Sequence, residues 1–337
     1  MSRLFEKDLR PGLPVTPAAM RRLPGLFILL ALILASCATL PSSRGASQWI
    51  GVLPPASPES VYASINPSSS RGLLETLART AGAETEQLER ITTRIHRVFA
   101  QIRFSPGGAP SFSLIALGEV TPTSVALQLN LDPAWQRVLL SKFPGRGFTG
   151  SHWSYRTYWR NAASGLQIAA PQRGVLFVAG GAPSTAAGML QRLQSPGVDP
   201  LPPEAAPDLE TADIFLYFPD PAGLAASSDP GLLPHQLPIR QIWISAAAEQ
   251  DSYDLEAVFL LSEVENLRAV ELLLRLMLTL WLRKAEVEDP VGKLKTARIR
   301  VEQGSARIDS LKLTGLEIAS FFQVLVPEGF PADGQPQ

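Results

Sequence analysis

The sequence predicts an α+β protein made of two tandem copies of a β-(α)-ββ-α-ββ-α unit, with mostly antiparallel sheets covered by helices. One observation is a set of short segments in which apolar and polar residues alternate, which is typical of half-buried strands. A second is a set of leucine-rich segments at helical spacing. The third is that both kinds of segment recur in the same order along the chain. Because apolar helix faces need a sheet to cover, the pattern favours layers of helices on sheets.

The first copy, residues 59–195, begins with a strand at Ser60–Ile65, where every second residue is apolar. Apolar residues at helical spacing then predict a helical region from Leu73 to Ile102, with a break near Gly82. The remaining predicted elements are strands at Ser111–Val120 and Ser124–Leu131, a helix from Asp132 to Lys142, strands at Ser151–Arg160, Leu166–Ala170 and Gly174–Ala179, and a helix from Ser184.

The second copy, residues 213–326, follows a Pro-rich linker at residues 196–212. Two of its helices are expected to open with capping boxes, at Ser262–Glu265 and Thr314–Glu317. The predicted elements are a strand at Asp213–Phe218, a loop at 220–238, a hairpin of Arg240–Glu249 and Ser252–Leu261, a Leu-rich helix through Trp281, a hairpin of Thr296–Glu302 and Ala306–Leu313, and a helix to Val324. Residues 327–337 are expected to form a disordered tail.

Constant spacing indicates that the two copies arose by duplication. The predicted helix caps Asp132 and Ser262 lie 130 residues apart, as do Ser184 and Thr314. Fixed internal periods are the signature of repeated structure. The alternative is a chance recurrence, because ββα units are common.

The segment from Met20 to Cys37 has the layout of a secretory signal: two arginines, an apolar core and small residues before a cut site. The core is about half the ~20 residues that a spanning helix needs. We therefore expect residues 1–36 to be a signal peptide. Either Met20 is the true start, or residues 1–19 form an unusually long basic region.

The ending Leu34-Ala35-Ser36-Cys37 resembles the lipobox of bacterial lipoproteins. The resemblance implies that the Cys37 sulfur receives a diacylglyceryl group, that the chain is cut before Cys37, and that the new amino terminus is acylated, for example with palmitate. Ala38, in place of Asp, favours the outer membrane over the inner membrane. Residues 37–58 are rich in Ser, Pro, Gly and Ala and are expected to form a flexible tether.

Composition limits the functions that the chain can have. Its 337 residues are 45% hydrophobic and 18% charged, with a net charge of −1. This composition is globular and gives no electrostatic reason to expect nucleic acid as a partner. Cys37 is the single cysteine, so the mature domain has no internal disulfide.

The sequence contains none of the local motifs of serine hydrolases, zinc proteases or phosphate-binding loops. Its three histidines, His96, His152 and His235, are far apart and have no acidic residue at ligand spacing. We therefore expect no catalytic residues, metal or cofactor, and a non-catalytic lipoprotein that binds a protein or another envelope component. The alternatives are an envelope-acting hydrolase whose site is assembled from separated residues, and a passive structural lipoprotein.

The aromatic segment Ser151–Arg160 is the best candidate for a ligand site, and the spacing places it in the first copy only. As a strand it would carry Arg156, Tyr158 and Arg160 on one face, with His152 nearby. Stacking and charge-assisted hydrogen bonds from such side chains suit an amphipathic or glycan ligand. The alternative is a core strand with solvated arginines.

The helix predicted at Val264–Trp281 is apolar nearly all round. Such a helix is normally buried on more than one side, here between the two copies. The alternative is an exposed flank that docks a partner. Arg268, Glu271 and Arg275 argue against a membrane span.

Overall fold

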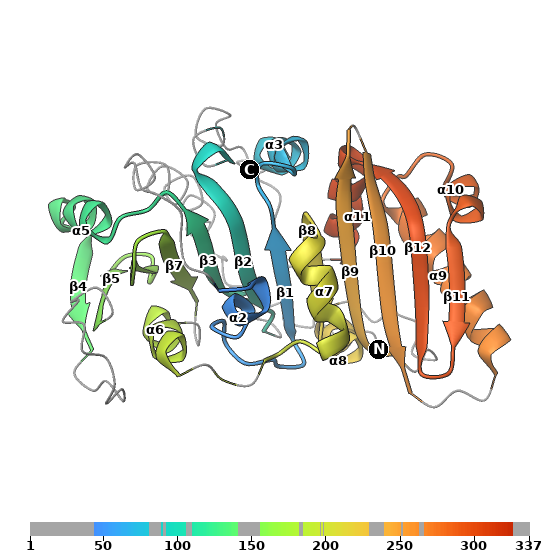
Figure 1. Ribbon diagram of the computed structural model, residues 1–337, viewed down its shortest axis with the longest axis horizontal. Coiled ribbons are helices and arrows are strands. Elements are labelled where there is room, and N and C mark those ends of the chain that lie inside the picture. Colours follow the sequence, from blue (N-terminus) through green and yellow to red (C-terminus); the bar gives the residue numbers. More distant parts are fainter. Residues whose placement is uncertain are drawn as a thin grey trace, which may run out of the picture.

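The computed structural model describes residues 44–80, 89, 92–105, 110–140, 156–181, 185–195, 197, 199–228, 239–250, 252–262 and 266–325. Within these residues the chain forms a single 12-stranded antiparallel sheet with helices on both of its faces (Figure 1). The predicted α+β class is therefore confirmed. The predicted signal peptide, Cys37 and the tail 327–337 lie outside the described residues.

The strands are β1 (Ser60–Ile65), β2 (Ile95–Arg103), β3 (Ser111–Gly118), β4 (Trp135–Leu139), β5 (Thr157–Asn161), β6 (Gln167–Ala169), β7 (Val175–Gly180), β8 (Ile214–Phe218), β9 (Ile239–Glu249), β10 (Ser252–Leu261), β11 (Arg298–Glu302) and β12 (Ser305–Thr314). The helices are α2 (Ala46–Ile50), α3 (Arg71–Thr80), α5 (Pro122–Leu131), α6 (Ala186–Gln194), η3 (Pro203–Ala205), α7 (Ala206–Thr211), α8 (Pro221–Ser228), α9 (Leu267–Lys284), α10 (Pro290–Thr296) and α11 (Gly315–Leu325).

The order of the strands repeats between the two halves of the sheet, as the prediction of two copies expects. The sheet runs β11-β12-β10-β9-β8-β1-β2-β3-β7-β6-β5-β4. Read outward from the centre, β8-β9-β10-β12-β11 repeats the connectivity of β1-β2-β3-β7-β6. The first strands of the two copies pair antiparallel, with Tyr62 opposite Tyr217 and Ile65 opposite Ile214. The two copies thus join edge to edge, and the hairpin β4–β5 is an addition to the first copy.

Different helices cover the two faces of the sheet. On one side, which we call the α9 face, α3, α8, α9, α10 and α11 pack on the second copy, and α5 packs on the first. On the other side, the α7 face, α2, α6 and α7 pack on the centre of the sheet and on the first copy. Figure 1 shows α2, α6 and α7 in front of the sheet and α9 and α11 behind it. Adjacent residues alternate accordingly: Val61 faces the α9 side and Tyr62 the α7 side.

The predicted helical region ends earlier than expected. Helix α3 confirms its first part, but Ile95–Arg103 is strand β2, which lies between β1 and β3. Ile95 and Phe99 are spaced as in a helix, yet both are buried because a central strand has apolar contacts on both faces. His96, predicted beside a helical stripe, is an exposed strand residue.

Between residues 121 and 142 the structure has a helix followed by a strand, which is the reverse of the predicted order. The segment predicted as a strand is helix α5, whose N-cap Thr121 accepts a hydrogen bond from the Ser124 amide at 3.3 Å. Pro122 then occupies the first helical turn, where proline is well tolerated. The segment predicted as a helix from Asp132 contains strand β4, and the Asp132 carboxylate instead accepts from the Ala134 amide.

Of the two capping boxes predicted in the second copy, one is confirmed and the other is wrong. The capping box at Thr314 is confirmed: the Glu317 amide donates to Thr314 Oγ1 at 3.3 Å, and the Thr314 amide donates to Glu317 Oε2 at 2.8 Å. The box predicted at Ser262 is wrong, because α9 begins later and Asn266 Oδ1 caps it by accepting from the Ala269 amide. The spacing of 130 residues between Asp132 and Ser262 therefore does not join equivalent caps.

Three segments expected to be loops contain packed structure. Within the predicted tether 37–58, Trp49, Ile50, Val52 and Leu53 are each at most 1% exposed. Small and polar residues dominate that segment, but these few apolar side chains are enough to fix it to the sheet. The linker 196–212 contains η3 and α7, and the predicted loop 220–238 contains α8.

Candidate interaction surfaces

The predicted ligand strand is shorter than expected and forms part of the added hairpin. In β5, Trp159 is 1% exposed and its indole Nε1 donates to Asn130 Oδ1 on α5 at 2.9 Å. The neighbouring residues point the other way: Arg160 is exposed, whereas Tyr158 is half-buried and packs against the core of the α7 face. Arg156 is exposed just before the strand, and His152 lies outside the described residues. The structure thus brings Tyr158 and Arg160 to one face but does not leave both in solvent.

Large exposed apolar side chains gather on the α9 face. Apart from Leu139 on β4, those found among the described residues all belong to α5, α9, α10 and α11: they are Leu127, Leu131, Leu267, Leu272, Leu276, Leu280, Val291 and Leu316. Helix α9 carries a stripe of three, Leu272, Leu276 and Leu280, which are 64%, 57% and 54% exposed. They follow one another at i, i+4 and so share one side of the helix. We call them the α9 stripe.

The other side of α9 is buried. Leu274 is 0% exposed and Met277 2%, and both pack into the core beneath the helix. The expectation that this helix is enclosed between the two copies is therefore wrong: it covers the sheet of its own copy and presents its stripe outward. An ion pair between Arg275 and Glu271, at 3.0 Å, lies along the helix beside the stripe. None of the described helices has the length and hydrophobicity of a membrane span.

The segment before β1 is fixed to the α7 face. Arg44 Nη2 donates to the Leu193 carbonyl oxygen of α6 at 3.2 Å, and its guanidinium lies 5.4 Å from the centre of the Trp49 ring. The Ser47 amide donates to Glu210 Oε1 of α7 at 3.3 Å. The segment therefore contacts both helices that flank it.

Buried polar groups hold the end of the same segment. Arg192 Nε donates to the Val52 carbonyl at 2.9 Å, and the Tyr62 hydroxyl donates to the Pro54 carbonyl at 2.6 Å. Gln101 Nε2 reaches both the Pro55 carbonyl and the Tyr62 hydroxyl. Burial raises the pKa of Tyr62 and lowers that of Arg192. Arg192, Tyr62 and Gln101 each donate a hydrogen bond to a backbone carbonyl of residues 52–55. These hydrogen bonds hold the segment against the sheet.

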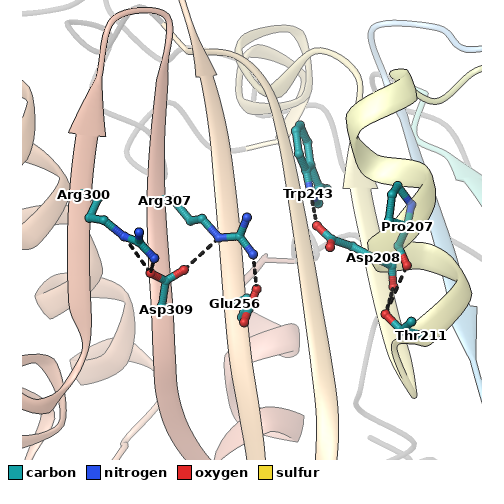
Figure 2. Close-up of polar contacts among 8 residues, drawn as sticks. All are labelled: Pro207, Asp208, Thr211, Trp243, Glu256, Arg300, Arg307 and Asp309. Atoms are coloured by element: carbon teal, nitrogen blue, oxygen red, sulfur yellow. Dashed lines mark hydrogen bonds and ion pairs between the residues drawn. The ribbon is translucent and has the colours of Figure 1, made fainter.

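None of the described helices covers the outer strands of the second copy on the α7 face, and this part of the face is charged. Figure 2 shows Asp309 on β12 between Arg300 of β11 and Arg307, which also pairs with Glu256 of β10. The covered part of this face ends at α7, where Trp243 Nε1 of β9 donates to Asp208 Oδ2 at 2.8 Å. Partial burial acts to raise the pKa of Asp309, but hydrogen bonds from Arg300 and Arg307 outweigh it and the pKa is lowered. These oppositely charged side chains form ion pairs with one another across neighbouring strands.

The described residues contain no group of three or more His, Cys, Asp or Glu side chains placed to hold a metal ion. His96 is exposed on β2, and His152 and His235 lie outside the described residues.

Comparison with known proteins identifies the fold. The chain matches no protein-family model and no curated protein. It shares its fold with TP0453. The structure of crystal form III of TP0453 superposes with a TM-score of 0.56 at 16% identity, over 83% of this chain and 98% of that one. Crystal forms I and IV give TM-scores of 0.54 at 16% and 17% identity, over 85% and 83% of this chain and 99% and 97% of theirs.

The likeness to TP0453 spans nearly all of that protein, so the joined double sheet is an arrangement that another chain also adopts. Identity at this level concerns the fold alone. Which residues act therefore has to be argued from this chain. Sequence reasoning named Arg156, Tyr158 and Arg160 but raised the outward side of α9 only as an alternative. The signal for the stripe was present: leucines on all sides of a helix are in excess of what one sheet can bury.

Proposed function

We propose that this chain is an exported, lipid-anchored and non-catalytic protein of the bacterial envelope that binds another envelope protein. The observation that carries the anchor is the Leu34-Ala35-Ser36-Cys37 ending after a short apolar core. A single acyl chain binds a membrane only weakly, whereas a diacylglyceryl group plus an acylated amino terminus anchors stably. Ala38 favours the outer membrane as the destination.

The anchor is tested by Cys37→Ala. The variant should lose labelling by radioactive palmitate and should move from the membrane to the soluble fraction. Ser42→Ala, which lies beyond the lipobox, is a control for the labelling assay. Equal membrane retention of wild type and Cys37→Ala would contradict the proposal. Density-gradient separation of the two membranes tests the destination, and recovery with the inner membrane would contradict it.

The observation that carries the binding function is the α9 stripe. Burying apolar surface contributes about 25 cal/mol per Å², so three leucines that are more than half exposed represent binding energy that the isolated chain does not use. The Arg275–Glu271 pair gives the stripe a charged rim, and an apolar centre with a polar rim is the anatomy of a protein–protein interface. The occupant that fits is a protein with a complementary apolar face.

A matched pair of double variants tests this assignment. Leu272→Glu with Leu276→Glu places two charges in the stripe, whereas Leu127→Glu with Leu131→Glu places two charges at exposed leucines of α5 with the same spacing. Cross-linking of the anchored protein in intact envelopes should lose its partner band with the α9 variant and keep it with the α5 variant. Retention of the band in the α9 variant, or loss in both, would show that the stripe is not the binding surface.

A further inference from the structure

The folded domain starts close to the anchoring residue. Only residues 38–43 separate Cys37 from Arg44, which is already fixed to the domain. Seven Cα–Cα steps at no more than about 3.6 Å give an upper limit of roughly 25 Å between the Cα atoms of Cys37 and Arg44. In an anchored chain, Arg44 and the part of the domain that it contacts therefore stay within that distance of Cys37.

The point of attachment lies on the α7 face. Arg44 contacts α6 through the Leu193 carbonyl, and the Ser47 amide contacts α7 through Glu210. The apolar side chains that follow, including Trp49 and Ile50, are buried in the core of this face. Release of this segment would expose them, so the short reach applies to the folded protein.

Layer thickness decides which face can lie against the bilayer. A sheet and a helix packed on it are about 10 Å apart, and a helix has a radius of about 5 Å with its side chains. With α9 resting on the bilayer, α2 would lie beyond the sheet, at a height of about 25 Å. A fully extended tether would be used up by that height alone. It would also have to pass around the ends of strands, whose half-length is about 10–15 Å.

We propose that the anchored protein lies with its α7 face toward the bilayer and presents the α9 stripe to the aqueous compartment. This inference rests on the proposed lipidation of Cys37. It specifies the partner of the stripe as a protein that approaches from the aqueous side, and it excludes the anchoring bilayer as the occupant.

The surface of the α7 face limits how deeply this face can approach the bilayer. The outward residues of η3 and α7 include Glu204 and Glu210, both exposed. Large exposed apolar side chains are absent from the described residues of α2, α6 and α7. The face therefore stands at headgroup level and does not enter the acyl chains.

The cysteine content makes the orientation directly measurable. Cys37 is the only cysteine and is consumed by the lipid, so one introduced cysteine takes a fluorescent label uniquely. Gln48→Cys on α2 and Glu204→Cys on η3 report the α7 face, and Arg268→Cys reports α9; all three native residues are exposed. The full-length lipidated protein is reconstituted into phosphatidylethanolamine–phosphatidylglycerol vesicles that carry a nitroxide on some headgroups.

Quenching at positions 48 and 204 should be several-fold stronger than at position 268. Insertion of about 20 Gly/Ser residues after Ala38 should keep the protein on the vesicles and abolish most of the difference, because a flexible chain of that length reaches around the domain. Equal quenching at all three positions, or stronger quenching at position 268, would overturn the orientation while leaving the anchor intact. Failure of the wild-type protein to float with the vesicles would overturn the anchor and the orientation with it.

Discussion

The two copies have the same order of strands and differ in what covers them. In the first copy the sheet is covered on both faces, by α5 on one and by α2 and α6 on the other. In the second copy the long helix α9 covers one face, while the other carries the open charged surface around Asp309. The helices α6 and α11, which follow the equivalent strands β7 and β12, pack on opposite faces. The difference teaches that strand order survives in a duplicated unit more readily than the choice of face for its last helix.

The largest expected effect concerns the added hairpin of the first copy. Trp159→Ala should lower the free energy of unfolding by about 3–5 kcal/mol, through lost burial and the cavity left behind. The side chain is 1% exposed and also donates a hydrogen bond to Asn130. Urea unfolding of the soluble domain measures the change. A loss below about 1 kcal/mol, typical of an exposed site, would mean that the hairpin does not share the core of its copy.

Substitutions on the two sides of α9 should differ sharply in how much they lower the free energy of unfolding. Leu274→Ala removes a side chain that is 0% exposed and should cost about 2–5 kcal/mol. Leu276→Ala removes one that is 57% exposed and should cost no more than about 0.5 kcal/mol. Thermal and urea unfolding of both variants provide the measurement. Similar losses would show that the stripe is buried in the isolated protein and is not free to bind.

The caps of α6 and α11 allow a direct comparison of the copies. Thr185 and Thr314 each accept a backbone hydrogen bond, so replacing either by Ala should cost about 1 kcal/mol. Position N3 holds Gly188 in α6 and Glu317 in α11. Only the cap of the second copy should therefore respond to pH.

The sign of the pH effect follows from Glu317. Partial burial acts to raise the pKa of its carboxyl, but hydrogen bonds from Lys293 and Thr314 outweigh it and the pKa is lowered. A lowered folded-state pKa contributes stability that is fully present above the ordinary glutamate value and is lost as the pH falls through the folded value. The free energy of unfolding should be larger for wild type than for Glu317→Gln at pH 7, and the two values should converge as the pH falls below about 4. A difference that persists at acid pH would contradict this.

The smallest expected effects are on the α7 face. Asp309→Asn should cost about 0.5–1 kcal/mol and less in high salt, since its partners Arg300 and Arg307 are about half exposed. Arg160→Ser, in the predicted ligand strand, should change stability by no more than about 0.5 kcal/mol. If Arg160→Ser loses the cross-linked partner band while its stability is unchanged, the binding surface lies on β5 and not on the α9 stripe. Unchanged cross-linking would assign that strand a structural role.

Local signals predicted much of the fold. The strands β1, β3, β7, β8, β9, β10, β11 and β12 lie close to where alternation and turn residues placed them. The cap at Thr314 was visible because its bonds join residues three positions apart. The residues of α5 were misassigned because Val125, Leu127, Leu129 and Leu131 alternate, whereas the helix buries only Val125 and Leu129 of these and exposes the other two. The alternation alone fits a strand, and only the packing of the folded chain makes this segment a helix.

The sequence by itself determined the α+β class, because alternation and helical spacing are local to the chain. It also raised the expectations of two copies and of a lipid anchor at Cys37. Only the tertiary structure decided that the copies share one sheet, since the pairing of Tyr62 with Tyr217 joins residues far apart in sequence. It also decided that residues 44–58 belong to the domain and that the α9 stripe faces outward. Burial depends on which surfaces meet, and that is settled when the whole chain packs.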